Sequence, residues 1–187
     1  MPDVDSAETA VKTRSRWKSA VLYWVFAITA TVVGMGWYTQ SSWLNSDVGE
    51  LLSAGDEIVA APIVARDGSV QTLSDYKGRY VLLDFWASWC PYCRYSLPAY
   101  EALQRKYPQR LAVLPINTLE ALDKGATFLE QEGIDLPALK SPQLVEQFKV
   151  KVLPTTVLLD PDGKRVWAVV GYVPLLTVAL LEKKIKP

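Results

Sequence analysis

Short apolar runs alternate with amphipathic segments along the last two thirds of the chain. Apolar runs bounded by Gly, Pro, Asp and Ser predict strands, and apolar residues spaced three and four positions apart predict helices. Strands are expected at residues 61–65, 70–73, 80–85, 111–116, within 150–160 and at 165–170, and helices at 90–107, 119–131, 141–148 and 175–185. Strands alternate with helices first and pair as a hairpin at the end, which predicts an α/β fold with a mixed β-sheet flanked by helices.

A different pattern precedes this region. Residues 20–38 contain no charged side chain. A helix of about 20 residues spans about 30 Å, the thickness of the hydrocarbon core of a bilayer. Aromatic residues flank the segment, as interface anchors do, at Trp17, Trp37, Tyr38 and Trp43. The segment predicts a transmembrane helix, with a cleaved signal peptide and a buried core helix as alternatives.

The basic residues predict the orientation of this helix. They cluster before the apolar segment, and no Lys or Arg follows it until Arg66. By the positive-inside rule, the N-terminus is expected in the cytoplasm and the following domain outside it. The chain then divides into a cytoplasmic tail, a transmembrane helix, a linker and a folded domain, at residues 1–18, 19–38, 39–57 and 58–187.

The composition excludes several classes of function. The chain has no histidine, which removes Cys–His hydrolases and histidine-ligated metal sites. The formal net charge is zero, and no long basic run is present, so nucleic acid is not an expected partner. An acid–base partner for a thiol must therefore be a carboxylate, a lysine, a tyrosine or water.

Both cysteines lie in one short motif, Cys90-Pro91-Tyr92-Cys93. The motif follows the apolar run 80–85 and opens a helical pattern, which places Cys90 near a helix N-terminus. Unpaired N–H groups and the helix dipole lower the pKa of a thiol there. Pro91 suits a first helical turn because its missing N–H costs nothing at that position. An accessible thiolate that attacks and a sheltered thiol that follows are what thiol–disulfide exchange needs, so the motif predicts a redox site.

Other roles for the two cysteines are weaker. A structural disulfide across so short a loop constrains the unfolded chain little. A zinc site needs about four ligands, and the chain offers two thiols and no histidine. A copper(I) site made of the two thiolates is one alternative, and an interaction domain with incidental thiols is another. The redox reading requires no cofactor and no metal.

Asp84 is the one charged residue in the apolar run before the motif. A buried carboxylate is costly unless it is paired, and burial raises its pKa toward the range useful for proton transfer. Our hypothesis is that Asp84 takes the proton from Cys93 as Cys93 attacks the mixed disulfide. The alternative is an aspartate that points to solvent at the end of the strand.

The stretch Phe85-Trp-Ala-Ser-Trp-Cys-Pro-Tyr-Cys93 resembles the active-site stretch of thioredoxin-fold proteins. The wider pattern resembles the TlpA/ResA/DsbE-like branch, which comprises membrane-tethered extracytoplasmic thiol oxidoreductases. The resemblance runs from about Ala60 to the C-terminus and is supported by residues 67–68, 73–78 and 153–163. It implies a thioredoxin-like fold in which Cys90 is the nucleophile and Cys93 the resolving thiol.

The resemblance also implies how a substrate is held. Pro154 matches the family's cis-proline, which lies opposite the cysteines and presents backbone to the substrate chain. From the sequence alone, Pro154 could equally be a trans proline that opens an edge strand. The expected substrate-contacting residues are Trp89, Pro91, Tyr92, Leu153 and Pro154.

Two positions depart from the family pattern. The family often has a glutamate where this chain has Ser96, and an asparagine where this chain has Asp84. An aspartate at that spacing before the first cysteine is instead similar to thioredoxin itself.

The family analogy implies a physiological setting. The expected function is reduction of disulfides in partner proteins, for example in cytochrome c maturation, with electrons from a membrane thiol donor. The expected location is a bacterial inner membrane, with the catalytic domain in the periplasm. A disulfide oxidase or isomerase that runs the same chemistry backwards is the near alternative.

Overall fold

The computed structural model describes residues 23–31 and 61–186. Residues 23–31 are helical and belong to a separate compact unit, residues 1–46. The predicted tail, linker and most of the predicted transmembrane segment lie outside the described residues. No helix within 23–31 or 61–186 is both long and apolar enough to cross a membrane.

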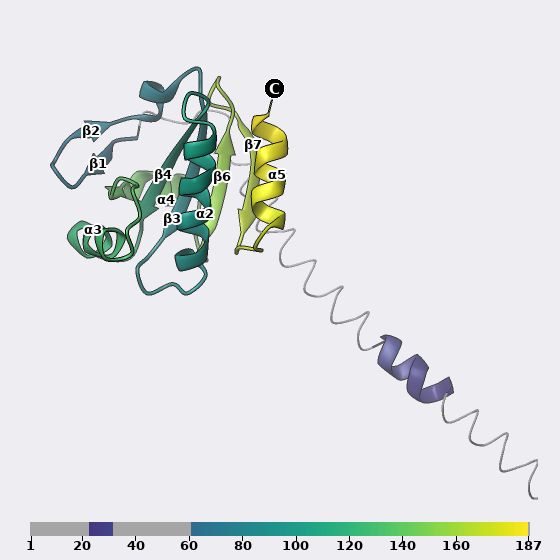
Figure 1. Ribbon diagram of the computed structural model, residues 1–187. Coiled ribbons are helices and arrows are strands. Elements are labelled where there is room, and N and C mark those ends of the chain that lie inside the picture. Colours follow the sequence, from purple (N-terminus) through teal and green to yellow (C-terminus); the bar gives the residue numbers. More distant parts are fainter. Residues whose placement is uncertain (1–22, 32–60, 187) are drawn as a thin grey trace, which may run out of the picture. The chain divides into compact units, whose positions relative to one another are not determined.

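A seven-stranded mixed sheet forms the centre of the domain (Figure 1). Its strands are β1 Ile63–Ala65, β2 Val70–Gln71, β3 Tyr80–Trp86, β4 Leu111–Asn117, β5 Leu139–Lys140, β6 Thr155–Leu159 and β7 Arg165–Val170. The strand order is β2-β1-β5-β4-β3-β6-β7. Strand β3 pairs parallel to β4 and antiparallel to β6. The predicted α/β fold with a mixed sheet is confirmed.

Helices connect and cover the strands. They are the 3-10 helix η1 Leu73–Tyr76 and the α-helices α2 Cys93–Lys106, α3 Leu122–Gln131, α4 Pro142–Gln147 and α5 Leu176–Ile185. Helices α2 and α5 lie side by side on one face of the sheet (Figure 1). Because α2 follows β3 directly, the segment between them lies at the carboxyl end of a central strand.

Several predicted boundaries were wrong. The two-residue strand β5 was not predicted, because so short a run carries no periodicity. Helix α2 begins at Cys93 and not at Cys90, since Tyr92 is the residue whose carbonyl accepts the first helical bond, from Ser96. Cys90 and Pro91 therefore lie in the turn before the helix and not in its first turn.

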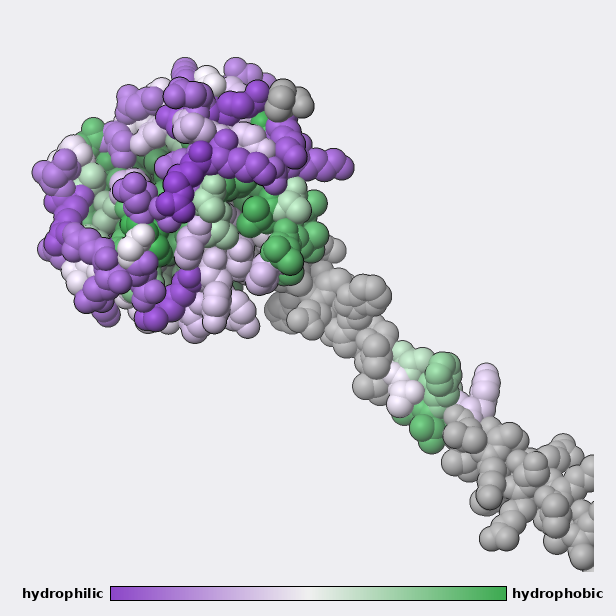
Figure 2. All heavy atoms as spheres, viewed as in Figure 1, coloured by the Kyte–Doolittle hydropathy of each residue, from purple (hydrophilic) through white to green (hydrophobic). Residues whose placement is uncertain are grey.

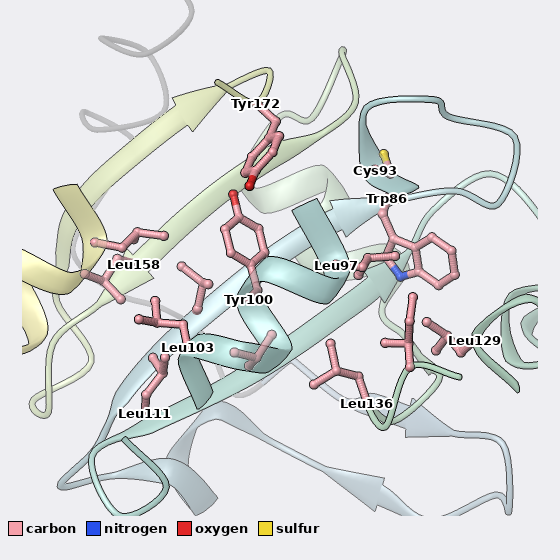
Figure 3. Close-up of a cluster of buried hydrophobic side chains, with 14 of the residues drawn as sticks. Trp86, Cys93, Leu97, Tyr100, Leu103, Leu111, Leu129, Leu136, Leu158 and Tyr172 are labelled. Carbon is pink, nitrogen blue, oxygen red and sulfur yellow. The ribbon is translucent and has the colours of Figure 1, made fainter. Parts of the chain in front are cut away.

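The side chains of β3 divide between two cores. Val81, Leu83 and Phe85 belong to one buried cluster, and Leu82 and Trp86 to the other. Successive side chains of a strand point to opposite faces, so Asp84 shares the face of Leu82 and Trp86. That face is covered by α2, and its cluster also contains both cysteines, of which Figure 3 labels Cys93. The strand period therefore turns Asp84 inward, beneath α2.

The face of the domain seen in Figure 2 is mostly hydrophilic. Figure 2 shows an apolar area over the end of α5 at which the helix begins. Exposed apolar side chains of this part of the sequence are Val173, Leu175, Leu176 and Leu180. Leu175 has a φ of 64°, in the left-handed region, immediately before the first residue of α5.

Candidate active site

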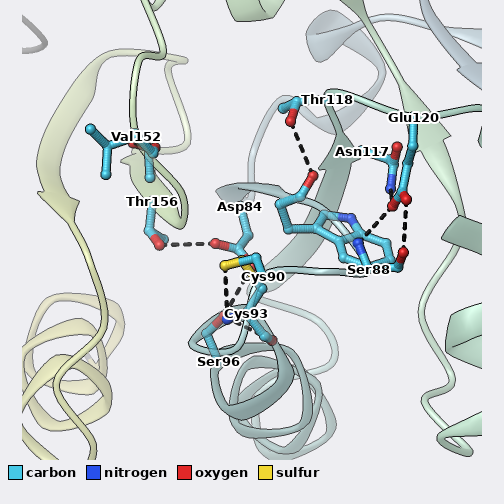
Figure 4. The surroundings of a disulfide bond; sticks show 12 residues. Asp84, Ser88, Cys90, Cys93, Ser96, Asn117, Thr118, Glu120, Val152 and Thr156 are labelled. Atoms are coloured by element: carbon cyan, nitrogen blue, oxygen red, sulfur yellow. Dashed lines mark hydrogen bonds between the residues drawn. A yellow bond between two sulfur atoms is a disulfide. The ribbon is translucent and has the colours of Figure 1, made fainter.

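Cys90 and Cys93 form a disulfide bond at the junction of β3 and α2 (Figure 4). Both residues are buried: Cys90 is 2 % exposed and Cys93 is 0 % exposed. The expectation of an accessible Cys90 is therefore not met in the disulfide form. The backbone N–H of Cys93 points at the Sγ atom of Cys90 across 3.3 Å. Negative charge on Cys90 would meet this donor at the start of a helix.

Exposed side chains surround the buried disulfide. Trp89 is 56 % exposed and Tyr92 is 62 % exposed, and Pro91 between the cysteines is also exposed. Trp86, by contrast, is fully buried and packs in the core against Phe128. The turn that carries Cys90 therefore has an aromatic, uncharged outer surface formed by Trp89, Pro91 and Tyr92.

The segment before β6 completes this side of the site. The Leu153–Pro154 peptide bond is cis, as the family resemblance implied. Leu153 is half-buried and packs against the cluster that contains both cysteines, whereas Pro154 is buried. Strand β6, Thr155–Leu159, begins directly after this bond and lies within the expected range 150–160.

Asp84 is completely buried beneath the turn that carries Cys90, which excludes the alternative that it points to solvent. Its Oδ1 atom accepts a hydrogen bond from Thr156 Oγ1 at 3.0 Å, and its Oδ2 atom lies 3.4 Å from Ser96 Oγ. Burial raises the pKa of Asp84 to about 7, although the two hydroxyl groups favour the charged form. Figure 4 shows Asp84 beside the disulfide, between the residues of β6 and α2. Near neutral pH this carboxyl group is therefore able to take or release a proton.

A chain of hydroxyl groups extends from Asp84. Ser96 Oγ also lies 3.3 Å from the carbonyl oxygen of Cys93, which links the carboxyl group to the second cysteine. On the other side, the hydroxyl groups of Tyr100 and Thr156 are 3.1 Å apart. Burial, together with the charge of Asp84, raises the pKa of Tyr100. Tyr172 stacks edge-on against Tyr100, and the two side chains meet in Figure 3.

Glu120 is a second carboxylate with a shielded side chain, bonded to the turn that leads to Cys90, and the sequence did not single it out. Its Oε1 atom accepts bonds from the Ser88 backbone N–H at 2.6 Å and from Asn117 Nδ2 at 2.8 Å. Its Oε2 atom accepts from Ser88 Oγ at 2.7 Å and lies 3.5 Å from Lys124 Nζ. Polar residues directly after the buried run of β4 were the available signal, because parallel strands end at the same edge of a sheet.

The pKa of Glu120 is lowered, the opposite of Asp84. Burial alone would raise it, but the bonds from Asn117 and from the Ser88 N–H and hydroxyl groups, with the charge of Lys124, outweigh burial. The side chain is 5 % exposed, so this fixed negative charge is shielded from water.

The cysteine sulfurs are the donors that the copper(I) alternative would use. In this structure both sulfurs are engaged in the disulfide. Within the described ranges, no three or more His, Cys, Asp or Glu side chains are grouped so that they could hold a metal ion.

The fold, the buried cysteine pair and the cis-proline together define a thioredoxin-fold thiol–disulfide oxidoreductase of the TlpA/ResA/DsbE-like type. The AhpC/TSA family matches residues 54–167, more than half of the sequence. The chain therefore belongs to the AhpC/TSA family.

Named relatives agree with this assignment. The thioredoxin-like protein YneN of Bacillus subtilis is 32% identical over 132 residues, which cover 68% of this chain and 76% of YneN. The thiol-disulfide oxidoreductase ResA of Bacillus subtilis is 32% identical over 126 residues, 65% of this chain and 70% of ResA. A crystal structure assigned to a thiol:disulfide interchange protein DsbE of Chlorobium tepidum superposes with a TM-score of 0.64 at 34% identity, covering 72% of this chain and 96% of that one.

Proposed function

We propose that the chain reduces disulfides of partner proteins through Cys90 and Cys93, outside the cytoplasm of a bacterial cell. In this proposal residues 19–38 anchor it in the inner membrane, a membrane thiol donor supplies electrons, and cytochrome c maturation is one process served. The observation that carries the proposal is the Cys90–Cys93 disulfide with Asp84 buried beside it.

The first step is attack by Cys90. In the reduced protein the Cys90 thiolate attacks one sulfur of the partner's disulfide, so a mixed disulfide forms and the other partner sulfur leaves as a thiolate that takes a proton from water. The N–H of Cys93 and the start of α2 stabilise the attacking thiolate. Trp89, Pro91, Tyr92, Leu153 and the backbone at Pro154 contact the partner. Cys90 is buried in the disulfide form. In this proposal the partner reaches Cys90 after the Cys90–Cys93 bond has been reduced, or by displacing the side chains that surround it.

The second step is attack by Cys93. The Asp84 carboxylate takes the proton of the Cys93 thiol, and the resulting thiolate attacks the Cys90 sulfur of the mixed disulfide. The second partner sulfur leaves as a thiolate, and the Cys90–Cys93 bond forms. Two electrons have moved to the partner, and the membrane donor returns them to the pair. A carboxyl group with a pKa of about 7 suits this proton transfer at neutral pH.

The reduction potential of the Cys90–Cys93 pair tests the direction of transfer. The protein is equilibrated in thiol–disulfide buffers, and the reduced fraction is measured by trapping free thiols, with Cys90→Ser as the blank. A potential near about −270 mV supports a reductant, and one near about −120 mV means a disulfide oxidant and overturns the proposed direction. The absence of any reversible two-electron couple would overturn the redox role of the pair.

A further inference from the structure

We propose that Glu120 is a positioning residue that holds the turn carrying Cys90, through Ser88, and keeps a shielded negative charge at this turn. The inference rests on the proposed roles of Cys90 and Cys93. It adds that Glu120 restrains the reactivity of Cys90, although Glu120 is 30 positions away in the sequence and outside the cysteine motif.

The segment that follows β4 is hydrogen-bonded to the end of β3 and to the segment after it, at Trp86 and at Ser88. Thr118 donates to the Trp86 carbonyl oxygen from its backbone N–H at 3.0 Å and from its Oγ1 at 3.2 Å. Glu120 then accepts both the N–H and the hydroxyl of Ser88. Residues 86 and 88 are thus tied down on either side of Ala87 (Figure 4).

A further hydrogen bond connects this restrained segment to Cys90. The backbone N–H of Cys90 donates to the Ala87 carbonyl oxygen at 3.1 Å, which closes the turn. Two bonds to a charged acceptor at Ser88 and one backbone bond at Cys90 leave the turn few ways to move. The position of the Cys90 sulfur therefore depends on a carboxylate contributed by the neighbouring strand connection.

Hydrogen bonds from neighbouring residues also fix the position of Glu120. Asn117, fully buried, donates to it, and the adjacent helix residue Gly125 leaves room for Asn117. A Cβ atom at Gly125 would lie 2.6 Å from Asn117 Nδ2. The backbone carbonyl of Glu120 also accepts from Lys140 Nζ at 2.8 Å. The carboxylate therefore occupies one defined position and is not a mobile surface acid.

The charge has a predictable effect on Cys90. A fixed negative charge near a thiol disfavours the thiolate and so slows reactions that need it. The charged groups around this side of the site include Asp84 on β3, Arg94 on α2, and Asp123 and Lys124 on α3. Lys124 pairs with Glu120, and Asp123 pairs with Arg66. Arg94 faces Glu132 at 3.8 Å and lies over the Phe128 ring, and Lys124 is 64% exposed, so neither fully offsets the buried carboxylate.

The test uses full-length Glu120→Gln, Ser88→Ala and, as matched control, Glu130→Gln, an exposed acid on α3. In the reduced proteins, the rate at which iodoacetamide modifies Cys90 is followed from pH 5 to pH 10 by mass spectrometry. We expect Cys90 of Glu120→Gln to react about threefold to tenfold faster than Cys90 of wild type at pH 6. The two rates should converge at pH 10, where Cys90 is ionised in both proteins. Ser88→Ala, which keeps the charge, should stay within about twofold of wild type. Glu130→Gln should match wild type.

Amide hydrogen exchange of the peptide spanning residues 86–93 supplies a readout that needs no redox chemistry. We expect faster exchange at Ser88 and Cys90 in Glu120→Ala and Ser88→Ala than in wild type or Glu130→Gln. Unchanged exchange in both variants, or an unchanged pH profile in Glu120→Gln, overturns the inference. If wild type shows this protection and pH profile but no reversible Cys90–Cys93 couple, the proposed function fails and the positioning role stands.

Discussion

Asp84 and Glu120 are two shielded carboxyl groups on either side of the same turn, and they have opposite electrostatics. Asp84 meets only neutral hydroxyl groups, at 3.0 and 3.4 Å, and its pKa rises to about 7. Glu120 meets a backbone N–H, an amide, a hydroxyl and an ammonium group, and its pKa falls below its ordinary value. Burial is common to both, so the partners decide which carboxyl group stays charged.

The difference in pKa suits the two carboxyl groups to different roles. A group whose pKa lies near the working pH exchanges protons, which suits the proposed role of Asp84. A group that stays ionised holds donors in place, which suits the proposed role of Glu120. The pH dependence of stability should therefore have opposite signs at the two positions.

Replacing Asp84 with Asn should have the largest effect. The carboxyl group has a pKa of about 7 in the folded protein against an ordinary 3.8, so the folded state keeps a proton that the unfolded chain releases. Stability is lost as the pH rises through this window, and the full cost applies above pH 7. Asp84→Asn removes that cost and should stabilise the oxidised protein by about 4 kcal/mol at pH 8 and by little at pH 4. Urea unfolding at both pH values measures the difference.

The same variant tests the proton transfer. Asp84→Asn should slow the attack of Cys93 on the mixed disulfide about a hundredfold at pH 7 and leave the attack of Cys90 nearly unchanged. Cys93→Ser, which stops at the mixed disulfide, isolates the first step, and Asp123→Asn on the exposed face of α3 is the control. Equal slowing of both steps would falsify the role of Asp84 as proton acceptor.

Replacing Glu120 with Gln should have a smaller effect of the opposite sign. The variant loses charge-assisted bonds from Ser88 and Asn117 and should be destabilised by about 2 to 3 kcal/mol at pH 7. Because the folded pKa of Glu120 is lowered, the advantage of wild type should shrink as the pH falls below 4.5 through that pKa. Thermal unfolding between pH 3 and pH 7, with Glu130→Gln as control, measures it. A constant difference across this range would show that packing, and not ionisation, is responsible.

Replacing Thr156 with Val should have the smallest effect on the comparison. Loss of the Oγ1–H donor removes the main bond that favours the Asp84 carboxylate, so the pKa of Asp84 should rise by about one further unit. Tyr100→Phe is the matched variant, because it removes the Tyr100 hydroxyl that contacts Thr156 but keeps the hydrogen bond from Thr156 to Asp84. We expect a pKa rise of less than about half a unit there.

The carboxyl ¹³C signal of Asp84 followed by NMR titration reports both variants. Equal rises in Thr156→Val and Tyr100→Phe would mean that Asp84 senses the whole hydroxyl chain and not its direct donor.

Local patterns in the sequence were sufficient for much of the fold and for the centre of the site. The strand-like run before Cys90, the helical pattern after Cys93 and the hairpin around residues 160–163 were all predictable, because each depends on the spacing of apolar residues and on turn residues close in sequence. Asp84 stood out in the same way, as the one charged residue in an apolar run, although the sequence left open whether it faced the core or solvent.

The family resemblance added what spacing alone could not decide. Pro154 was compatible with a cis or a trans bond, and only its match to the family pattern favoured the cis form that the structure has. The start of α2, by contrast, depended on which carbonyl accepts the first helical bond, and the sequence placed it three residues too early.

By itself, the sequence determined the identity of the redox pair and the aspartate beneath it, since both follow from residues adjacent along the chain. The tertiary structure alone decided what surrounds them: Thr156 and Ser96 at Asp84, and Glu120 at Ser88. These partners come from β6, from α2 and from the connection after β4. A pKa depends on distances between atoms that the chain brings together only on folding. For that reason the acid proposed to exchange protons was visible in the sequence, whereas the acid proposed to hold the turn was not.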